Sequence, residues 1–523
     1  MLNYWWVTRP KRKLNSIPEV LAAFSNVALS VCWTGERKIH ILFEDELERD
    51  GLKRIGERRD HTGSGGRTYQ AWLSSLGLIF IQEQTGIPFL TLAGEAIMEG
   101  KSPVEVLKAQ VLKYQFPSPF GIKTKVSEKF RIHPFVFLLR LLSDSRIQYL
   151  TEEEIAKAVI TEAENESDEC FEYVVSRVLD FRERGDKSLP EDFIYQHAPS
   201  TGRVNPDHPF SHLTDTANTL VNWLEYTQLV YRENGRMRIV NDRKDEVNQI
   251  LGRKSVFIEH PERHEFFQRR YGIDPWHIKD TRNLLNTAHV TSTAIEKQRI
   301  RQAFIAYSIH RPISKIDHKI VLEIALQTGT SERLVEEVLY KEYSHGAIGG
   351  FLSGYYEMAF KGRDEATDFE VATANLFQDV FGINAVHLGQ TGSKSAPDVL
   401  LISDEEKYQA IIDNKAYSEY SITGDHHNRM VHNYVEKVSR YSPSNYPIGF
   451  FTYIAGGFSG MIDRQIGKES EECNVPGSAI TVGNIIKLVE HQQNNPLSHR
   501  DLKKLFSVNR QIMLRDITDD LSA

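Results

Sequence analysis

Two carboxylates and an ammonium lie inside an apolar stretch in the last third of the chain. The stretch Pro397–Tyr417, PDVLLISDEEKYQAIIDNKAY, predicts two strands joined by the charged turn DEEK. Side chains alternate across a strand, so Asp413 and Lys415 share one face and Asn414 points to the other. Asp398 stands at the start of the paired strand and can converge on the same point. By this reasoning Asn414 is replaceable, whereas the other three side chains form one polar cluster.

This set of side chains suits the hydrolysis of a phosphodiester. Two carboxylates from Asp398 and Asp413 are what Mg²⁺ requires, because this cation takes a few protein oxygens and completes its shell with water and phosphate. Lys415 could orient the attacking water or stabilise the charged transition state. Glu370, on the helix expected over Thr367–Gly382, could add a carboxylate at the rim. The alternative is a surface hairpin with cross-strand ion pairs; the preceding amphipathic helix and the alternation favour a nuclease.

The composition of the 523 residues is that of an ordinary globular protein, with room for about three domains. No apolar run approaches the roughly 20 residues of a membrane span, and the first residues lack the apolar core of a signal peptide. The three scattered cysteines form no disulfide framework, so we expect a reducing cytoplasm. A net charge of −8 argues weakly against a nucleic-acid partner, but the charge is unevenly distributed, with four cations in Thr8–Lys13.

Two helix–hairpin patterns in the first half predict winged-helix-like modules. In Gly65–Gly100 a helix precedes a hairpin around TGIP and a second helix. In Thr216–Arg243 a helix precedes two strands around the Asn-Gly turn of ENGR. Modules of this kind can place a helix in the major groove of DNA, although they also serve protein contacts.

Several isolated cations and histidines have alternative interpretations. Arg9, Lys11, Arg12 and Lys13 are candidate contacts to DNA phosphates, or else a solvated arm. Arg67 is a further candidate; it ends TGSGGR, which lacks the ending of a P-loop and is expected to be a mobile loop. His426 and His427 have no partner ligands at metal-binding spacing and are expected at the surface.

The last third of the chain resembles the PD-(D/E)xK nuclease core and is particularly similar to the cleavage domain of FokI-type type IIS restriction endonucleases. The likeness covers roughly Thr367–Leu505, where the motifs follow in order; they are Glu370, His387-Leu388-Gly389, Pro397-Asp398, Asp413–Ser418, NYVEKV and IGFFTYIAGGFSG. The resemblance implies that Asp398 and Asp413 bind the metal and that Lys415 is catalytic, and it extends, as a weaker transfer, to Glu370 as a further catalytic residue.

The front of the chain is similar to the recognition part of AlwI-type type IIS restriction and nicking enzymes. This likeness begins at LTLAGEAIMEGKSPVEVLKAQVLKYQFPS and RIHPFVFLLRLL, and NWLEYTQLVYRENGRMRIVN and HEFFQRRYG extend it to about residue 275. The expected organisation is multidomain. A mainly α-helical recognition region with winged-helix modules occupies residues 1–290, a helical linker residues 291–358, and an α/β nuclease domain with a mixed central sheet residues 359–523. Within the linker, the glycine-rich Ser344–Glu357 is expected to form a joint.

Together the resemblances imply a bacterial, Mg²⁺-dependent endonuclease. It would bind a short asymmetric site in double-stranded DNA, cut a few base pairs away, leave 5′-phosphate and 3′-hydroxyl ends, and pair transiently through its nuclease domain to cut both strands. The alternatives are a strand-specific nicking enzyme on the same scaffold, and a DNA-binding regulator with an inactive nuclease-like domain. The intact set of Asp398, Asp413 and Lys415 argues against the regulator.

Two positions of one helix depart from the FokI pattern. There, the helix bearing the YV motif carries an acid–arginine pair that joins two cleavage domains. Here Arg429 and Asn433 stand at those places, so that contact is not reproduced. An apolar stripe of Met430, Tyr434 and Val438 remains, and it would serve either a dimer or packing on the sheet.

Overall fold

A computed structural model gives the fold. It describes residues 1–518, apart from residues 30, 57, 59, 201, 254–255, 283–291, 344–345, 361, 363–365 and 390–395. The chain divides into two compact units: an N-terminal unit of Met1–Ala306 and Val321–Glu342, and a C-terminal unit of Tyr307–Ile320 and Tyr343–Ala523. The segment 291–358, expected as a linker, is thus shared between the two units, and the three-part division stays a prediction. No described helix has the length and apolar character that a membrane crossing requires.

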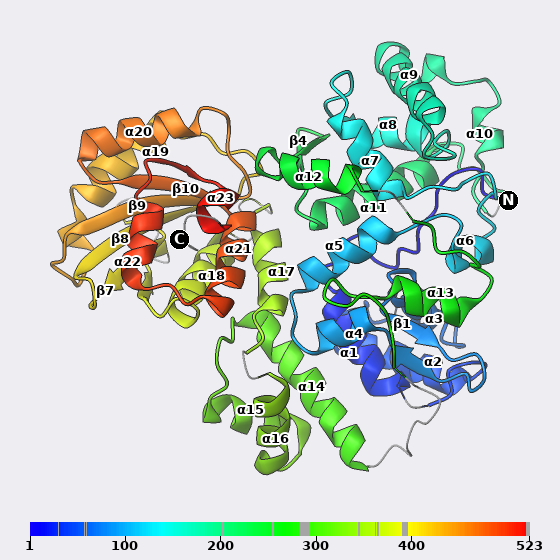
Figure 1. The fold of residues 1–523 in the computed structure, drawn as a ribbon, viewed down its shortest axis with the longest axis horizontal. Helices are drawn as coiled ribbons and strands as arrows, with labels where there is room; N and C mark the ends of the chain where they lie inside the picture. Colours follow the sequence, from blue (N-terminus) through cyan, green and yellow to red (C-terminus); the bar gives the residue numbers. More distant parts are fainter. Residues whose placement is uncertain are drawn as a thin grey trace. The chain divides into compact units, whose positions relative to one another are not determined.

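The N-terminal unit is mainly helical, as expected (Figure 1). Its helices are α1 (Ile17–Ala28), α2 (Arg37–Arg49), α3 (Ser64–Ser75), α4 (Leu92–Met98), α5 (Pro103–Lys113), α6 (Pro119–Lys123), α7 (Pro134–Ser143), α8 (Glu152–Glu154), η1 (Ile155–Val159), α9 (Asp168–Arg184), η2 (Gly185–Ser188), α10 (Phe193–Gln196), α11 (Ser211–Tyr226), η3 (Asn241–Arg243), α12 (Lys244–Leu251), α13 (His264–Tyr271), α16 (Glu332–Glu342) and most of α14 (Ser292–His310) and of α15 (His318–Thr328).

Both expected helix–hairpin patterns are present in this unit. After α3, the strands β1 (Ile79–Ile81) and β2 (Pro88–Leu90) pair antiparallel, and α4 follows. After α11, the strands β4 (Val230–Glu233) and β5 (Arg236–Ile239) pair antiparallel, and β3 (Leu150–Thr151) adds a third strand beside β5. The order of elements is confirmed, and the assignment to the winged-helix class stays a prediction.

The glycine-rich TGSGGR segment is not a loop, contrary to expectation. Gly63 has φ +76° and caps α3, which begins at Ser64 and contains Arg67. A Cβ on Gly63 would lie 2.6 Å from the Cβ of His40, and one on Gly66 would lie 2.4 Å from the His40 carbonyl oxygen. These glycines are needed for the close approach of α3 to α2, which a sequence pattern read as flexibility cannot show.

The C-terminal unit is built on a mixed six-stranded sheet, as expected. The strand order is β11-β10-β9-β8-β7-β6, with β6, β7 and β8 antiparallel and β8 to β11 parallel. The strands are β6 (Asn384–His387), β7 (Val399–Ser403), β8 (Tyr408–Lys415), β9 (Ile448–Ala455), β10 (Gly477–Thr481) and β11 (Arg510–Ile512).

Helices cover both faces of this sheet (Figure 1). One core contains apolar residues of α17 (Gly349–Met358), α18 (Ala366–Asp379), α21 (Val482–Asn494), α22 (His499–Phe506) and α23 (Leu514–Thr518). The core on the other face contains residues of η6 (Arg429–Val435) and α20 (Ile462–Cys473), and η6 continues directly from α19 (Gly424–Asn428) and precedes η7 (Val438–Arg440). Of the glycine-rich segment expected to be a joint, residues 344–345 lie outside the described residues, and the part from Gly349 forms α17, in which Phe351, Leu352 and Tyr355 are buried in the first core. The two units meet in the sequence between Glu342 and Tyr343, next to this segment, and its role as a joint stays a prediction.

Candidate active site

The predicted hairpin brings the three candidate catalytic side chains together. The strands β7 and β8 pair with Val399 opposite Ile412, so Asp398 lies at the end of the hairpin where β8 carries Asp413 and Lys415. The Nζ atom of Lys415 lies 2.6 Å from Oδ2 of Asp413. The backbone N–H of Asn414 donates to Oδ2 of Asp398 over 2.7 Å. Two antiparallel strands thus hold two carboxylates and one ammonium at one end of the hairpin.

This cluster is short of positive charge. The side chains of Asp413 and Lys415 are only 4% and 12% exposed. Burial, and next the neighbouring charge of Asp413, raise the pKa of Asp398 well above its ordinary value. The pKa of Lys415 is also raised, because burial lowers it but the carboxylates of Asp413 and Asp398 raise it more. Lys415 therefore carries its charge at neutral pH, whereas Asp398 is shifted toward its protonated form, because one ammonium does not balance two ionised carboxylates.

The donor set fits a divalent cation with hard oxygen ligands. Asp398 lies close enough to Asp413 that the charge of Asp413 raises the pKa of Asp398, and a bound Mg²⁺ would offset that repulsion. Within the described ranges, no group of three or more His, Cys, Asp or Glu side chains has the arrangement of a metal site. Two carboxylates with open positions for water and phosphate are nevertheless the usual protein share of a Mg²⁺ shell.

Glu370 lies at the rim of the cluster and has a partner that the sequence reasoning did not assign. Its Oε2 lies 2.9 Å from Nε2 of His387, at the end of β6. The charge of Glu370 contributes to the raised pKa of Asp398, which places it within electrostatic reach of the cluster. A Cβ on Gly389 would lie 1.9 Å from Glu370 Oε2, so glycine leaves this carboxylate room. The HLG motif singles out His387 in the sequence, but it does not predict that His387 contacts Glu370.

Asn414 points away from the face that carries Asp413 and Lys415, as strand alternation predicts. It is buried, and its Nδ2 donates to Oγ1 of Thr373 on α18 over 2.6 Å. The same Oγ1 lies 2.9 Å from the hydroxyl of Tyr355 on α17 and donates to the carbonyl oxygen of Phe369. Asn414 thus ties the catalytic strand to the helix that carries Glu370. We therefore expect replacement of this buried amide to cost stability, in contrast to the prediction from alternation alone.

The apolar stripe of η6 packs on the sheet. Met430 and Tyr434 are buried in the core between η6, α20 and the sheet, which accounts for these two residues without a dimer. Burial raises the pKa of Tyr434, and the charges of Asp413 and Asp398 raise it further, so its hydroxyl stays protonated beside the cluster. Arg429, at the place of the acid in FokI, pairs with Asp425 one helical turn earlier.

Glu469 is a second buried acidic side chain near Asp413. Tyr453 on β9 pairs in register with Asp413, and its hydroxyl donates to both oxygens of Glu469, over 3.2 and 3.1 Å. Burial raises the pKa of Glu469 to about 8. His427 Nδ1 lies 3.4 Å from Glu469 Oε1, and its Nε2 lies 3.0 Å from Glu472. His427 and His426 are half-buried, so the expectation that both lie at the surface was wrong.

Several of the cations predicted to contact DNA phosphates form hydrogen bonds or ion pairs within the N-terminal unit. Arg9 donates to Thr216 Oγ1 over 2.9 Å, and Arg12 pairs with Asp215 at 2.6 Å. Burial lowers the pKa of Lys11, against the opposing charge of Glu19, and Lys13 is exposed. Arg67 donates to the carbonyl oxygen of Thr62 over 2.5 Å and to its hydroxyl over 3.1 Å. A role for these five residues in DNA binding stays a prediction.

Comparison with known proteins supports the FokI part of the resemblance. Residues 329–513 match the family model described as "FokI, cleavage domain". A segment of 151 residues is 28% identical to the type II restriction enzyme StsI of Streptococcus sanguinis, and this match covers 27% of the present chain and 24% of StsI. The C-terminal part of the chain is therefore similar to a FokI-type cleavage domain. These matches give no support to an AlwI-like recognition region, which stays a prediction.

Solved restriction endonucleases overlap the chain only loosely. The structure of restriction endonuclease FokI is 14% identical, covers 98% of this chain and 99% of its own, and has a TM-score of 0.29. The BpuJ1 endonuclease binding domain, solved in a complex with modified DNA, is 18% identical, covers 51% of this chain and 96% of its own, and has a TM-score of 0.36.

Proposed function

We propose that this protein is a type II restriction endonuclease of type IIS architecture. It would hydrolyse phosphodiester bonds of double-stranded DNA in a Mg²⁺-dependent reaction. The observation that carries the proposal is the convergence of Asp398, Asp413 and Lys415 at one end of the β7–β8 hairpin. The hairpin lies inside the segment that matches the FokI cleavage domain model.

Each side chain of the cluster would have a distinct part in the reaction. Asp398 and Asp413 would hold Mg²⁺, which when bound lowers the pKa of a water molecule and neutralises charge on the phosphate. Lys415 stays protonated, so it would stabilise negative charge developing on the phosphate rather than accept a proton. Its ion pair with Asp413 restricts where the ammonium points. Glu370, held by His387, would orient groups at the rim.

The N-terminal unit would read a short asymmetric site, with cleavage a few base pairs away. Its two helix–hairpin patterns support this assignment, because such modules can present a helix to the major groove. A transient homodimer through the nuclease domain would allow both strands to be cut. A strand-specific nicking enzyme on the same scaffold is the second candidate, favoured by the departure at Arg429 and Asn433, where the FokI dimer contact is not reproduced.

Cleavage of supercoiled plasmid in Mg²⁺, followed by run-off sequencing of the ends, tests this proposal. We expect linear product with ends at a fixed distance from one short sequence, and no product in EDTA. Open circles alone would identify the nicking enzyme. An intact plasmid under all conditions would support the regulator with an inactive nuclease-like domain. Fragments without a common sequence would contradict the site-specific reading.

A further inference from the structure

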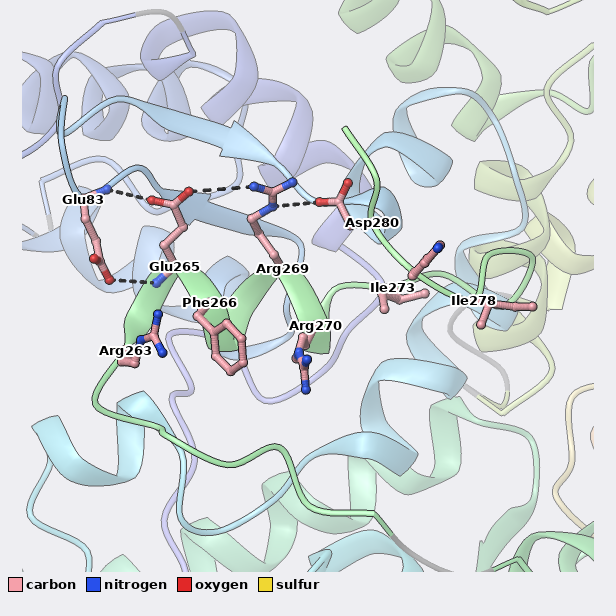
Figure 2. A pocket seen from close by; sticks show the side chains of 10 residues that line it. Glu83, Arg263, Glu265, Phe266, Arg269, Arg270, Ile273, Ile278 and Asp280 are labelled. Atoms are coloured by element: carbon pink, nitrogen blue, oxygen red, sulfur yellow. Dashed lines mark hydrogen bonds and ion pairs between the residues drawn. The ribbon is translucent and has the colours of Figure 1, made fainter. Parts of the chain in front are cut away.

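Helix α13 in the N-terminal unit presents two charged faces of different character (Figure 2). On one face a row of polar groups is paired throughout. The backbone N–H of Glu83 donates to Glu265 Oε2 over 3.0 Å, and the backbone N–H of Glu265 donates to Glu83 Oε1 over 3.3 Å. Arg269, one turn later, lies 4.0 Å from Glu265 Oε1 and 3.0 Å from Asp280 Oδ2. The acids on this face therefore have partners within the unit.

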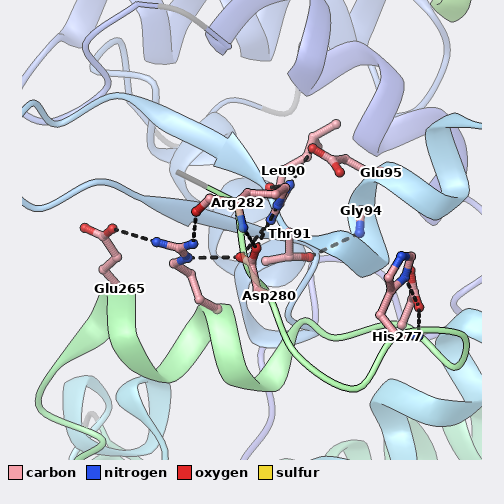
Figure 3. A network of polar contacts seen from close by, with 10 residues as sticks. Leu90, Thr91, Gly94, Glu95, Glu265, His277, Asp280 and Arg282 are labelled. Atoms are coloured by element: carbon pink, nitrogen blue, oxygen red, sulfur yellow. Dashed lines mark hydrogen bonds and ion pairs between the residues drawn. The ribbon is translucent and has the colours of Figure 1, made fainter. Parts of the chain in front are cut away.

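This paired face fixes α13 and the segment after it to the β1–β2 hairpin and α4 (Figure 3). Asp280 accepts hydrogen bonds from both Arg269 and Arg282. Burial raises the pKa of Asp280, but these hydrogen bonds outweigh burial and leave that pKa below its ordinary value. Arg282 also donates to the Leu90 carbonyl oxygen over 3.1 Å and pairs with Glu95. The helix is thus held before any partner binds, which reduces the ordering cost of binding.

The opposite face of α13 carries cations that form no ion pair with the described residues of the unit. Arg263, Phe266 and Arg270 are spaced i, i+3 and i+7, and their side chains extend from the same side of the helix in Figure 2. The guanidinium groups of Arg263 and Arg270 lie 4.9 and 4.5 Å from the centre of the Phe266 ring. Both arginines are exposed, and over the described ranges neither forms an ion pair. The ring limits where the two guanidinium groups can point.

A cavity of about 710 Å³ opens beside this helix. Its lining includes Arg263, Phe266 and Arg270 and also the exposed Lys279. The carboxylates in the lining are Glu83, Glu265 and Asp280, and they lie along the paired face. The cationic side of the cavity is therefore complementary to an anion that approaches from solvent.

We propose that Arg263 and Arg270, oriented by Phe266, bind the sugar–phosphate backbone of duplex DNA. This inference rests on the proposed function. Arginine presents its N–H donors in a planar fork that matches phosphate oxygens. The two guanidinium groups lie 4.9 and 4.5 Å from the same ring centre, so they are close enough together to contact neighbouring phosphates of one strand. Such contacts position the protein and carry no sequence information.

The double variant Arg263→Gln/Arg270→Gln tests this surface in the full-length chain. The probe is a fluorescent mixed-sequence duplex, titrated by anisotropy at several salt concentrations in EDTA so that nothing is cut. Each phosphate contact contributes about 0.9 to the slope of log K against log salt, so we expect the slope to fall by about 1.8 and the affinity to fall most at low salt. The control Lys244→Gln/Arg253→Gln removes two exposed cations on and beside α12, and we expect it to change the slope little.

The readouts separate the failure of this inference from that of the proposed function. If wild type cuts plasmid but the α13 double variant has the same salt slope as wild type or the control, the proposed DNA contact of Arg263 and Arg270 is wrong. The nuclease assignment is then unaffected. Wild type that neither binds the duplex nor cuts plasmid overturns both. Phe266→Leu keeps both charges, and we expect it to weaken binding less than the double variant; a wild-type affinity in Phe266→Leu would overturn the orienting role of the ring.

Discussion

The Nζ atom of Lys415 lies 2.6 Å from Oδ2 of Asp413, two residues earlier on β8, and both side chains are almost completely buried. The strand period of two places both on one face. Asp398 reaches them from the neighbouring strand through the backbone N–H of Asn414. The pairing keeps the ammonium charged next to two carboxylates, an arrangement suited to a metal and a phosphate.

Asp398→Ala and Asp413→Ala should each lower plasmid cleavage in Mg²⁺ by at least about 100-fold, because each removes a carboxylate that would hold the metal. Binding of duplex DNA in EDTA should stay within about two-fold of wild type, since phosphate contacts elsewhere supply most of that affinity. Asp368→Ala is the matched control, because Asp368 is exposed in the first turn of α18. Undiminished cutting by either site variant would refute the assignment.

Mg²⁺ should stabilise the wild-type protein against unfolding. A ligand that binds only the native state adds about 2.7 kcal/mol at 100 times its dissociation constant. Asp413→Asn removes one charged ligand, so the increase in melting temperature on adding Mg²⁺ should shrink or vanish. Differential scanning fluorimetry with and without Mg²⁺ measures this effect. An equal rise in the variant and in wild type would place the cation elsewhere.

Asn414→Ala should destabilise the protein by about 1–3 kcal/mol, because it removes a buried donor to Thr373 and leaves a small void between β8 and α18. Asn384 on β6 is exposed, and Asn384→Ala should stay within about 0.5 kcal/mol of wild type. Urea unfolding measures both variants. If Asn414→Ala behaves like the control, then strand alternation alone described this position correctly.

The stability of the protein should fall with rising pH through Glu469. Its pKa is raised from 4.5 to about 8, so between these values the native state holds a proton that the unfolded state has lost. The stability contributed by this group is therefore complete below about pH 4.5 and is lost as the pH rises to about 8. Glu469→Gln should flatten this dependence by up to about 1.4 kcal/mol per pH unit.

Urea unfolding across the same pH window measures the effect of Glu469→Gln. Glu472→Gln is the control, because Glu472 also contacts His427 but is 39% exposed. Equal slopes for Glu469→Gln and wild type would show that the buried carboxyl does not titrate in this window.

Local patterns in the sequence predicted the hairpin and the convergence of its polar side chains. The alternation of Asp413, Asn414 and Lys415 depends only on the period of a strand, and the turn DEEK lies between two apolar runs, so neither needs a distant partner. The two helix–hairpin patterns of the first half followed from the same kind of signal. The order of motifs across the last third resembles that of a FokI-type cleavage domain, and residues 329–513 match the model of that domain.

Tertiary packing alone decided the surroundings of the cluster. Asn414 meets Thr373 across 41 residues of sequence, Glu370 meets His387 across 17, and Tyr453 meets Glu469 across 16. Such pairs depend on how helices lie on the two faces of the sheet, and a periodic pattern gives the buried face of a helix but not its partner. For the same reason the glycines of α3 and α17 predicted flexibility, whereas in the structure they begin or lie within packed helices.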